Sequence, residues 1–242
     1  MKSHSLASLL LLICYASLHA DDASEWKERA AKLTQAIQAS PQSLDLYSQR
    51  GDLRFFLGEF AAAVADYDKM VELDREQDAG HWRRGIALFY AGAHEQAAGQ
   101  FERYHSFDNV DRENGIWRYL CQRKAFGETK AREGLLRYEK DDREPFGDVY
   151  RLFQGTVTAE ELLEKIRVAK ISETEREKRL FYAELYVGLN EAVEGREKTA
   201  QTHLAAAAKN PWGEKAGYGP HYMWQVARLH AELLAKPAAL PK

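Results

Sequence analysis

The chain has 242 residues, 45% of them hydrophobic and 29% charged, which is enough apolar material for a packed core and excludes a wholly disordered chain. With 34 basic and 37 acidic residues, the formal net charge is −3. This near balance gives no electrostatic reason to expect a nucleic-acid partner.

Residues 1–20 have the layout of a secretory signal peptide. Lys2 supplies a positive n-region, an apolar run covers residues 6–15, and Ala20 stands before two aspartates. The run is too short to span a bilayer, and no later segment is long enough. The alternative is a short buried helix, but the run of leucines has no polar face. We therefore expect an exported protein, periplasmic or envelope-associated, with no transmembrane segment.

The two cysteines have different expected roles. Cys14 lies in the predicted signal peptide, but Ile13 stands where a bacterial lipid-attachment motif needs a small residue, so we expect no lipid anchor. Cys121 is the one cysteine left after cleavage and therefore has no internal disulfide partner. We expect a buried, inert thiol there, and the alternative is a reactive one.

A fixed period dominates the following part of the chain. Five residue pairs lie 34 positions apart in one frame: Arg50/Arg84, Gly51/Gly85, Gly58/Gly92, Ala63/Ala97 and Tyr67/Phe101. This period is typical of the tetratricopeptide repeat (TPR), in which each unit is a helix A, a tight turn and a helix B. The sequence shows no strand-like alternation, so we predict an all-α fold, a TPR superhelical solenoid of antiparallel helix pairs.

The repeated positions have structural explanations in this frame. Small residues are expected where helices A and B touch, aromatic residues beside that contact, and glycines where helix A ends in a left-handed conformation. The predicted structural set is Gly51, Gly58, Ala63, Tyr67, Gly85, Gly92, Ala97, Phe101 and Ala131. Asp78 and Asp111 are expected to be N-caps of the helices that follow them.

Residues 21–242 are predicted to form a single TPR domain. In chain order its parts are a half repeat (25–40), repeat 1 (44–77), repeat 2 (78–111), a divergent repeat 3 (112–145), a short helix pair (146–171), a last repeat (172–210) and a C-terminal capping helix (221–236). Gly155 is expected to break the short pair. Thr158 and Ser172 are expected to open helices, because each has a glutamate three residues later.

Helix A of each repeat is expected to line a concave face that binds an extended or helical peptide. The candidate partner-binding residues are Phe55, Trp82, Arg83, Ile86, Phe89, Ile116 and Arg123. Aromatic residues and arginine are enriched at protein contacts. The alternative is that some of these side chains only pack helix A against its neighbour.

Arg50, Arg84 and Arg118 recur every 34 residues. They would form a ladder for an acidic partner, or each would pair with a local acid such as Asp66 or with a carbonyl. We favour the structural interpretation.

No pattern of catalytic residues appears in the sequence. The histidines form no metal-binding spacing, and neither a nucleophile elbow nor a phosphate loop is present. We therefore expect no enzyme, no cofactor and no metal site.

One stretch resembles a known family. Residues 84–92 (RGIALFYAG), followed by Gln96-Ala97 and by Trp117-Arg-Tyr-Leu120, are similar to the middle of the NlpI-type TPR lipoproteins of bacterial envelopes. Phe181-Tyr182 and a terminal helix follow in the same order. The resemblance spans about residues 44–235.

The resemblance implies a non-catalytic periplasmic adaptor that docks envelope proteases or peptidoglycan hydrolases and can form homodimers. An alternative is a structural or assembly subunit of an envelope or secretion complex. A third hypothesis, a small enzyme or metal protein, would have to use the histidines and Cys121.

Overall fold

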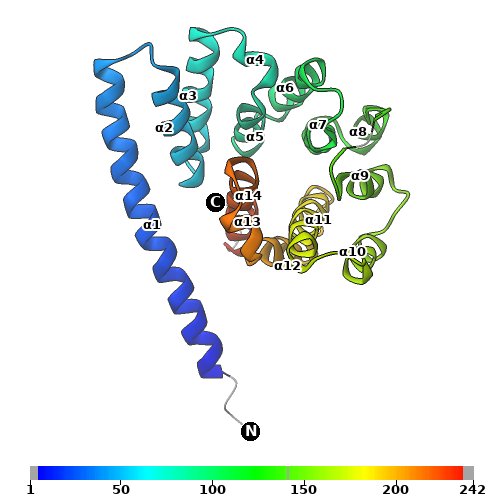
Figure 1. Ribbon diagram of the computed structural model, residues 1–242. Helices are drawn as coiled ribbons and strands as arrows, with labels where there is room; N and C mark the ends of the chain where they lie inside the picture. Colours follow the sequence, from blue (N-terminus) through cyan, green and yellow to red (C-terminus); the bar gives the residue numbers. More distant parts are fainter. Residues whose placement is uncertain (1–4, 141, 237–242) are drawn as a thin grey trace, which may run out of the picture. The chain divides into compact units, whose positions relative to one another are not determined.

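The computed structural model describes residues 5–140 and 142–236, with side chains from residue 22 onward. Across these residues the chain forms fourteen helices and no strand (Figure 1), so the predicted all-α class is confirmed. The side chains of the predicted signal peptide, Cys14 included, lie outside the described residues. None of the described helices has both the length and the apolar character that crossing a bilayer requires.

The chain forms two compact units, Met1–Gln77 and Asp78–Lys242, called here the N-unit and the C-unit. The N-unit contains α1 (Ser5–Ala39), α2 (Leu44–Phe56) and α3 (Phe60–Leu73). Helix α2 packs against both α1 and α3. The short α4 (Gln77–Gly80) contains the boundary between the units.

A close helix contact forms the core of the α2–α3 hairpin. A Cβ on Gly51 would lie 2.6 Å from the Tyr67 ring, so only glycine lets the two helices approach this closely. Gly58 has φ of +77° and ends α2 in the left-handed conformation that favours glycine. Both features agree with the expected roles of these residues.

The C-unit contains the remaining helices in a curved arrangement (Figure 1). They are α5 (Trp82–Tyr90), α6 (His94–Phe107), α7 (Arg112–Phe126), α8 (Glu128–Glu133), α9 (Phe146–Gln154), α10 (Ala159–Val168), α11 (Glu173–Val193), α12 (Glu197–Ala208), α13 (Pro211–Lys215) and α14 (Tyr218–Ala235). Helices α5 to α12 follow the curve, and α14 lies between α12 and α5.

The α5–α6 hairpin repeats the contact of the N-unit 34 residues later. A Cβ on Gly85 would lie 2.6 Å from the Phe101 ring. Gly92 has φ of +80° at the end of α5. The sequence pairs therefore mark equivalent positions in two hairpins, whereas a TPR superhelix as a whole stays a prediction.

The recurrent arginines each reach a partner sixteen residues later. Arg50 pairs with Asp66 at 2.6 Å, and Arg84 donates to Gln100 Oε1 at 2.6 Å. Arg118 donates to the carbonyl of Gly134. Each arginine thus has a local partner (a carboxylate, a side-chain amide or a backbone carbonyl), which favours the structural interpretation of this series.

One of the two expected N-caps differs from expectation. Asp78 lies inside α4 and is not an N-cap; its carboxylate pairs with Arg103 at 3.0 Å. The N-cap of α5 is His81, whose ring nitrogen accepts from the Arg84 amide at 3.2 Å. Asp111 caps α7 as expected, accepting from the Glu113 amide at 2.9 Å.

The last part of the chain is more helical than expected. The predicted loop before the closing helix contains α13, which begins at Pro211 after the N-cap Asn210. Helix α14 begins at Tyr218 rather than at residue 221. In the divergent third repeat, by contrast, α8 ends at Glu133, and residues 134–140 and 142–145 are irregular.

Candidate functional site

Helix α14 occupies the inner side of the C-unit, where an open groove was expected. The ring of Tyr222 on α14 meets the ring of Trp82 edge to face, with centroids 5.0 Å apart. His230 Nδ1 and the Tyr90 hydroxyl on α5 lie 2.9 Å apart. Because the chain's own helix packs against α5, the inner face of this unit is not free for a long partner helix.

Several of the candidate partner-binding residues lie in the packed interior. Phe55 is fully buried in the N-unit, beside Phe60 with ring centroids 5.4 Å apart. In the C-unit, Ile116 is fully buried and Phe89 is 7% exposed. Phe89 packs edge to face on Trp117 at 5.7 Å. For these three candidates the structure favours the packing alternative.

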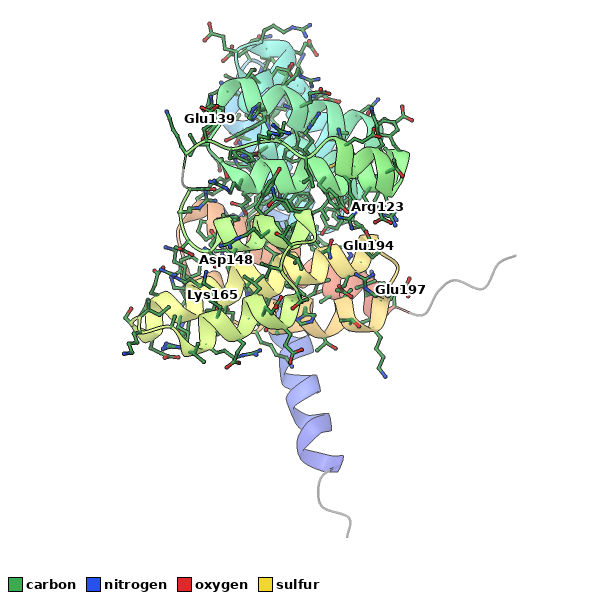
Figure 2. All side chains as sticks on the ribbon, turned by 90° about the vertical axis from the view of Figure 1, so that its right-hand side faces the viewer. Arg123, Glu139, Asp148, Lys165, Glu194 and Glu197 are labelled. Atoms are coloured by element: carbon green, nitrogen blue, oxygen red, sulfur yellow. The ribbon has the colours of Figure 1, made fainter. Side chains whose placement is uncertain are left out.

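The two basic candidates make internal contacts. Arg123 on α7 forms a bidentate ion pair with Glu194 at the end of α11 (Figure 2). Its Nε and Nη2 lie 2.9 and 3.1 Å from the two carboxylate oxygens. The Arg83 guanidinium lies over the Tyr218 ring, 5.6 Å from its centroid. These two arginines therefore join helices within the C-unit.

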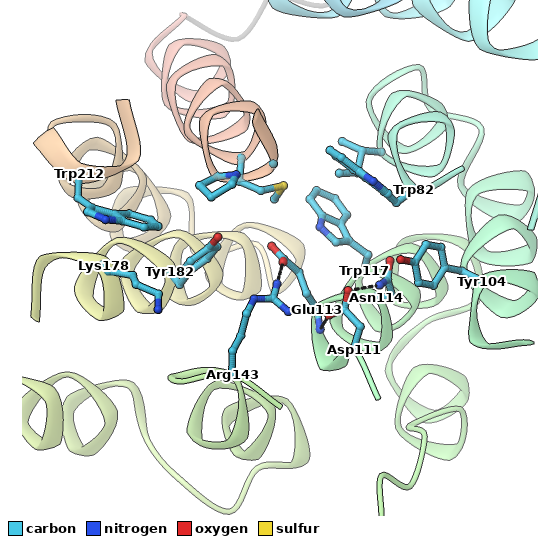
Figure 3. Close-up of a pocket in the computed structure, with 14 residues that line it drawn as sticks. Trp82, Tyr104, Asp111, Glu113, Asn114, Trp117, Arg143, Lys178, Tyr182 and Trp212 are labelled. Atoms are coloured by element: carbon cyan, nitrogen blue, oxygen red, sulfur yellow. Dashed lines mark hydrogen bonds and ion pairs between the residues drawn. The ribbon is translucent and has the colours of Figure 1, made fainter. Parts of the chain in front are cut away.

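The remaining two candidates, Trp82 and Ile86, line a cavity of about 350 Å³ inside the C-unit. Its walls come from α5, α6, α7, α11, α13 and α14 and from the segment before α9 (Figure 3). The aromatic lining residues are Trp82, Tyr104, Trp117, Tyr182 and Trp212. The polar lining residues are Asp111, Glu113, Asn114, Arg143 and Lys178.

The aromatic walls are held from behind by the core. Trp117 stacks on Phe101, with ring centroids 6.0 Å apart and an interplanar angle of 15°. Trp212 contacts Tyr182 with centroids 5.8 Å apart. Figure 3 shows Trp82 and Trp117 on one side of the cavity and Tyr182 and Trp212 on the other. Rings fixed in this way need little ordering when a ligand enters.

Arg143 joins the polar groups of the cavity. Its guanidinium bonds to Asp111 at 3.3 Å, to Asp142 at 3.2 Å, and to Glu113. Its central carbon also lies 4.2 Å from the centroid of the Phe146 ring. Carboxylates and an aromatic face thus hold this cation in one position.

Glu113 is the most perturbed acid of the cavity. Its side chain is 14% exposed, and burial raises its pKa from 4.5 to about 7, while the Arg143 charge opposes that shift. The Tyr186 hydroxyl on α11 donates to one of its oxygens and Arg143 to the other. A carboxyl that titrates near neutral pH is able to transfer protons, but protein donors already hold both of its oxygens.

The hydrogen bonding of the lining is uneven. All four carboxylate oxygens of Asp111 and Glu113 accept bonds from protein groups. Among the described residues, the buried indole N–H of Trp117 has no acceptor, and the Lys178 ammonium pairs with Glu175 at 3.4 Å. The lining therefore has two poorly paired donors, whereas its carboxylates are already engaged.

No set of three or more His, Cys, Asp or Glu side chains suited to a metal ion occurs in the described part of the chain. Cys121 is buried, and burial raises the pKa of its thiol well above the ordinary value. This agrees with the expected inert cysteine.

The sequence pattern missed most of the cavity. Arg143 and Trp212 lie in segments without helical periodicity, and Glu113 reads as the first turn of a helix. One signal in the sequence could have indicated the cavity: three polar residues, Asp111, Glu113 and Asn114, stand at a helix start shortly before Trp117. A search with models of known protein families finds none that matches this chain.

Proposed function

We propose that the chain is a non-catalytic, TPR-type adaptor that binds other proteins, and that a short segment of a partner enters the cavity of the C-unit. The 34-residue period, with its two equivalent hairpins, supports the repeat class. Repeat proteins of this kind bind partners on their inner surfaces.

One observation carries the proposal: an aromatic-walled cavity whose polar groups are already fixed. Trp and Tyr dominate binding energy at protein contacts when they lie in desolvated pockets. Trp82 and Trp212 are both half-buried at this cavity, so each still has ring surface to cover. A partner side chain that enters would bury this surface without reorganising the walls.

Binding is favoured over catalysis because the acids of the cavity are engaged. A general acid or base needs a free position within hydrogen-bond reach of the reacting atom. Tyr186 and Arg143 each hold an oxygen of Glu113, and Asn114 donates to Asp111 at 2.6 Å. These acids are better suited to holding Arg143 and the start of α7 in place.

The resemblance to the NlpI-type lipoproteins supports a location in the cell envelope. In this proposal the chain is exported by residues 1–20 and acts in the periplasm, where it docks a protease or a cell-wall hydrolase and pairs with a second copy. A fixed structural subunit of an envelope complex is the alternative.

The test is affinity capture from native envelope extract with residues 21–242 as bait. A bait carrying Trp82→Ala removes one wall of the cavity. A bait carrying Trp26→Ala is the matched control, since Trp26 is also a half-buried tryptophan but lies on α1 in the N-unit.

We expect the unchanged bait and the Trp26→Ala bait to capture the same protease or hydrolase, and the Trp82→Ala bait to lose it. Circular dichroism of the baits checks that each is folded. Capture of one multi-subunit assembly by all three baits would instead support the structural-subunit alternative and reject the cavity as the docking site.

A further inference from the structure

We infer that the segment entering the cavity is proline-rich and binds in the polyproline II conformation. The inference rests on the proposed function, because it names the chemistry of the partner segment. It follows from the peptide-binding modes that the fold leaves open, from the charge of the lining, and from its two poorly paired hydrogen-bond donors.

The architecture rules out two common ways of binding a peptide. Addition of a strand needs an exposed sheet edge, and the described residues contain no strand. Binding of a helix needs a long apolar groove, but α14 already packs on the inner side of the C-unit through Tyr222 and His230. An extended segment entering a compact, aromatic-lined cavity remains.

The charge of the lining favours a neutral segment. Two carboxylates, Asp111 and Glu113, and two cations, Arg143 and Lys178, face the cavity. An acidic or phosphorylated segment would meet the carboxylates, and a basic one would meet the cations. Arg143 is moreover surrounded by three acids, so it offers little attraction to an added anion.

The two poorly paired donors favour a segment rich in acceptors. Each carboxylate oxygen of Asp111 and Glu113 already accepts a bond from a protein group. Within the described part of the chain, by contrast, the indole N–H of Trp117 has no acceptor, and the Lys178 ammonium pairs with Glu175 at the long distance of 3.4 Å. A proline residue brings a carbonyl acceptor and no N–H donor. An ordinary peptide or a sugar brings donors as well as acceptors, and its donors would have to share carboxylate oxygens that already accept bonds from protein groups.

The shape of the walls suits the same ligand. Polyproline II has no internal hydrogen bonds, so all its carbonyls are available to donors in the cavity. Its proline rings are apolar, and aromatic-lined sites bind them because the helix is already ordered before binding. Trp82 and Trp117 on one wall, facing Tyr182 and Trp212 on the other (Figure 3), provide such a site.

The probe for the test is a blocked decaproline peptide, titrated into the full chain while tryptophan emission is recorded. Three of the five tryptophans line the cavity; the other two are Trp26 and Trp224. We expect a saturable change in emission with decaproline and none with a blocked glycine–serine peptide of the same length. The change should persist in Trp26→Phe.

Two variants locate the binding. Trp117→Phe keeps an aromatic ring but removes the unpaired donor, so the affinity for decaproline should fall roughly 3- to 10-fold. Trp82→Ala removes a wall and should weaken binding by more than about tenfold. The control is Trp224→Phe: its indole N–H bonds to the Ala208 carbonyl at 2.8 Å, away from the cavity lining, so it should leave affinity unchanged.

Three results would overturn the inference. The first is that decaproline gives no saturable response. The second is that the Trp82→Ala variant keeps its helicity and binds decaproline as tightly as the unchanged chain, and the third is that cellohexaose gives a saturable response where decaproline does not.

The partner assay separates the two proposals. If Trp82→Ala abolishes partner capture but excess decaproline does not displace the partner, the adaptor role stands and the proline-rich segment is rejected. If decaproline binds the cavity while capture is insensitive to Trp82→Ala, the docking site is rejected and the cavity's ligand class stands.

Discussion

Glu113 links three parts of the C-unit at the cavity. It stands in the first turn of α7, accepts a hydrogen bond from Tyr186 on α11, and pairs with Arg143 before α9. Its carboxyl is mostly buried, so the charged form is held by only a few donors. Protonation of this one side chain therefore changes the charge balance around Arg143.

Replacing Glu113 with glutamine should change how stability depends on pH. Burial raises its folded-state pKa from 4.5 to about 7, so between these values the folded protein holds a proton that the unfolded chain releases. This bound proton contributes on the order of 3 kcal/mol to the free energy of unfolding. The contribution is fully present below the unfolded-state pKa and is lost as the pH rises through the folded-state pKa.

The measurement is urea unfolding of the wild type and Glu113→Gln between about pH 4 and about pH 8. The wild type should lose stability relative to the variant as pH rises, since glutamine does not ionise. A stability difference that stays constant over this range would contradict the raised pKa of Glu113.

At the scale of helices, local contacts could be predicted from the sequence and distant ones could not. The pairs Gly51/Tyr67 and Gly85/Phe101 repeat at a fixed period because the same hairpin contact recurs. The contact between Tyr90 and His230 joins residues 140 positions apart. No periodic pattern encodes such a contact, and for that reason α14 was expected to cap the unit and not to fill its inner side.

The residues of the cavity show the same difference between local contacts, which the sequence predicts, and distant contacts, which it does not. Trp82 could be singled out because it begins a regular helix A. Arg143 could not, because it lies in an irregular segment and its partners Asp111 and Glu113 come from a helix about thirty residues earlier. Its role depends on the packing of α7 against α9 and α11, which single-sequence periodicity does not specify.

Two glycines of one hairpin should respond in opposite ways to alanine. A Cβ at Gly85 on α5 would lie 2.6 Å from the Phe101 ring, so Gly85→Ala should cost about 1–3 kcal/mol by overpacking. On α6, a Cβ at Gly99 would lie 3.7 Å from its nearest neighbour, the tip of Arg103. Gly99→Ala should therefore stabilise the helix by up to about 1 kcal/mol.

Urea unfolding followed by circular dichroism measures both changes. Because the two substitutions add the same methyl group, their difference reports the contact and not the loss of glycine itself. Equal effects of the two substitutions would show that α5 and α6 do not touch at Gly85.

At the scale of the whole molecule, each compact unit has a core of its own. Phe55 and Tyr67 are fully buried in the N-unit, and Trp117 and Tyr186 are within 1% of full burial in the C-unit. A chain with two such cores is expected to depart from two-state unfolding when the cores differ in stability. The tryptophans allow the two to be followed separately, since Trp26 is the one tryptophan of the N-unit.

In a Trp26→Phe background, emission reports the C-unit alone, whereas circular dichroism reports both units. Adding Gly51→Ala, whose Cβ would clash with Tyr67 at 2.6 Å, should lower the unfolding midpoint of the N-unit and leave the emission midpoint unchanged. Adding Gly85→Ala should lower the emission midpoint.

Because substitutions without shared partners act independently, an equal shift of the emission midpoint by both changes would mean that the units unfold as one. Separate shifts would mean that the cavity belongs to a unit whose stability does not depend on the N-terminal hairpin.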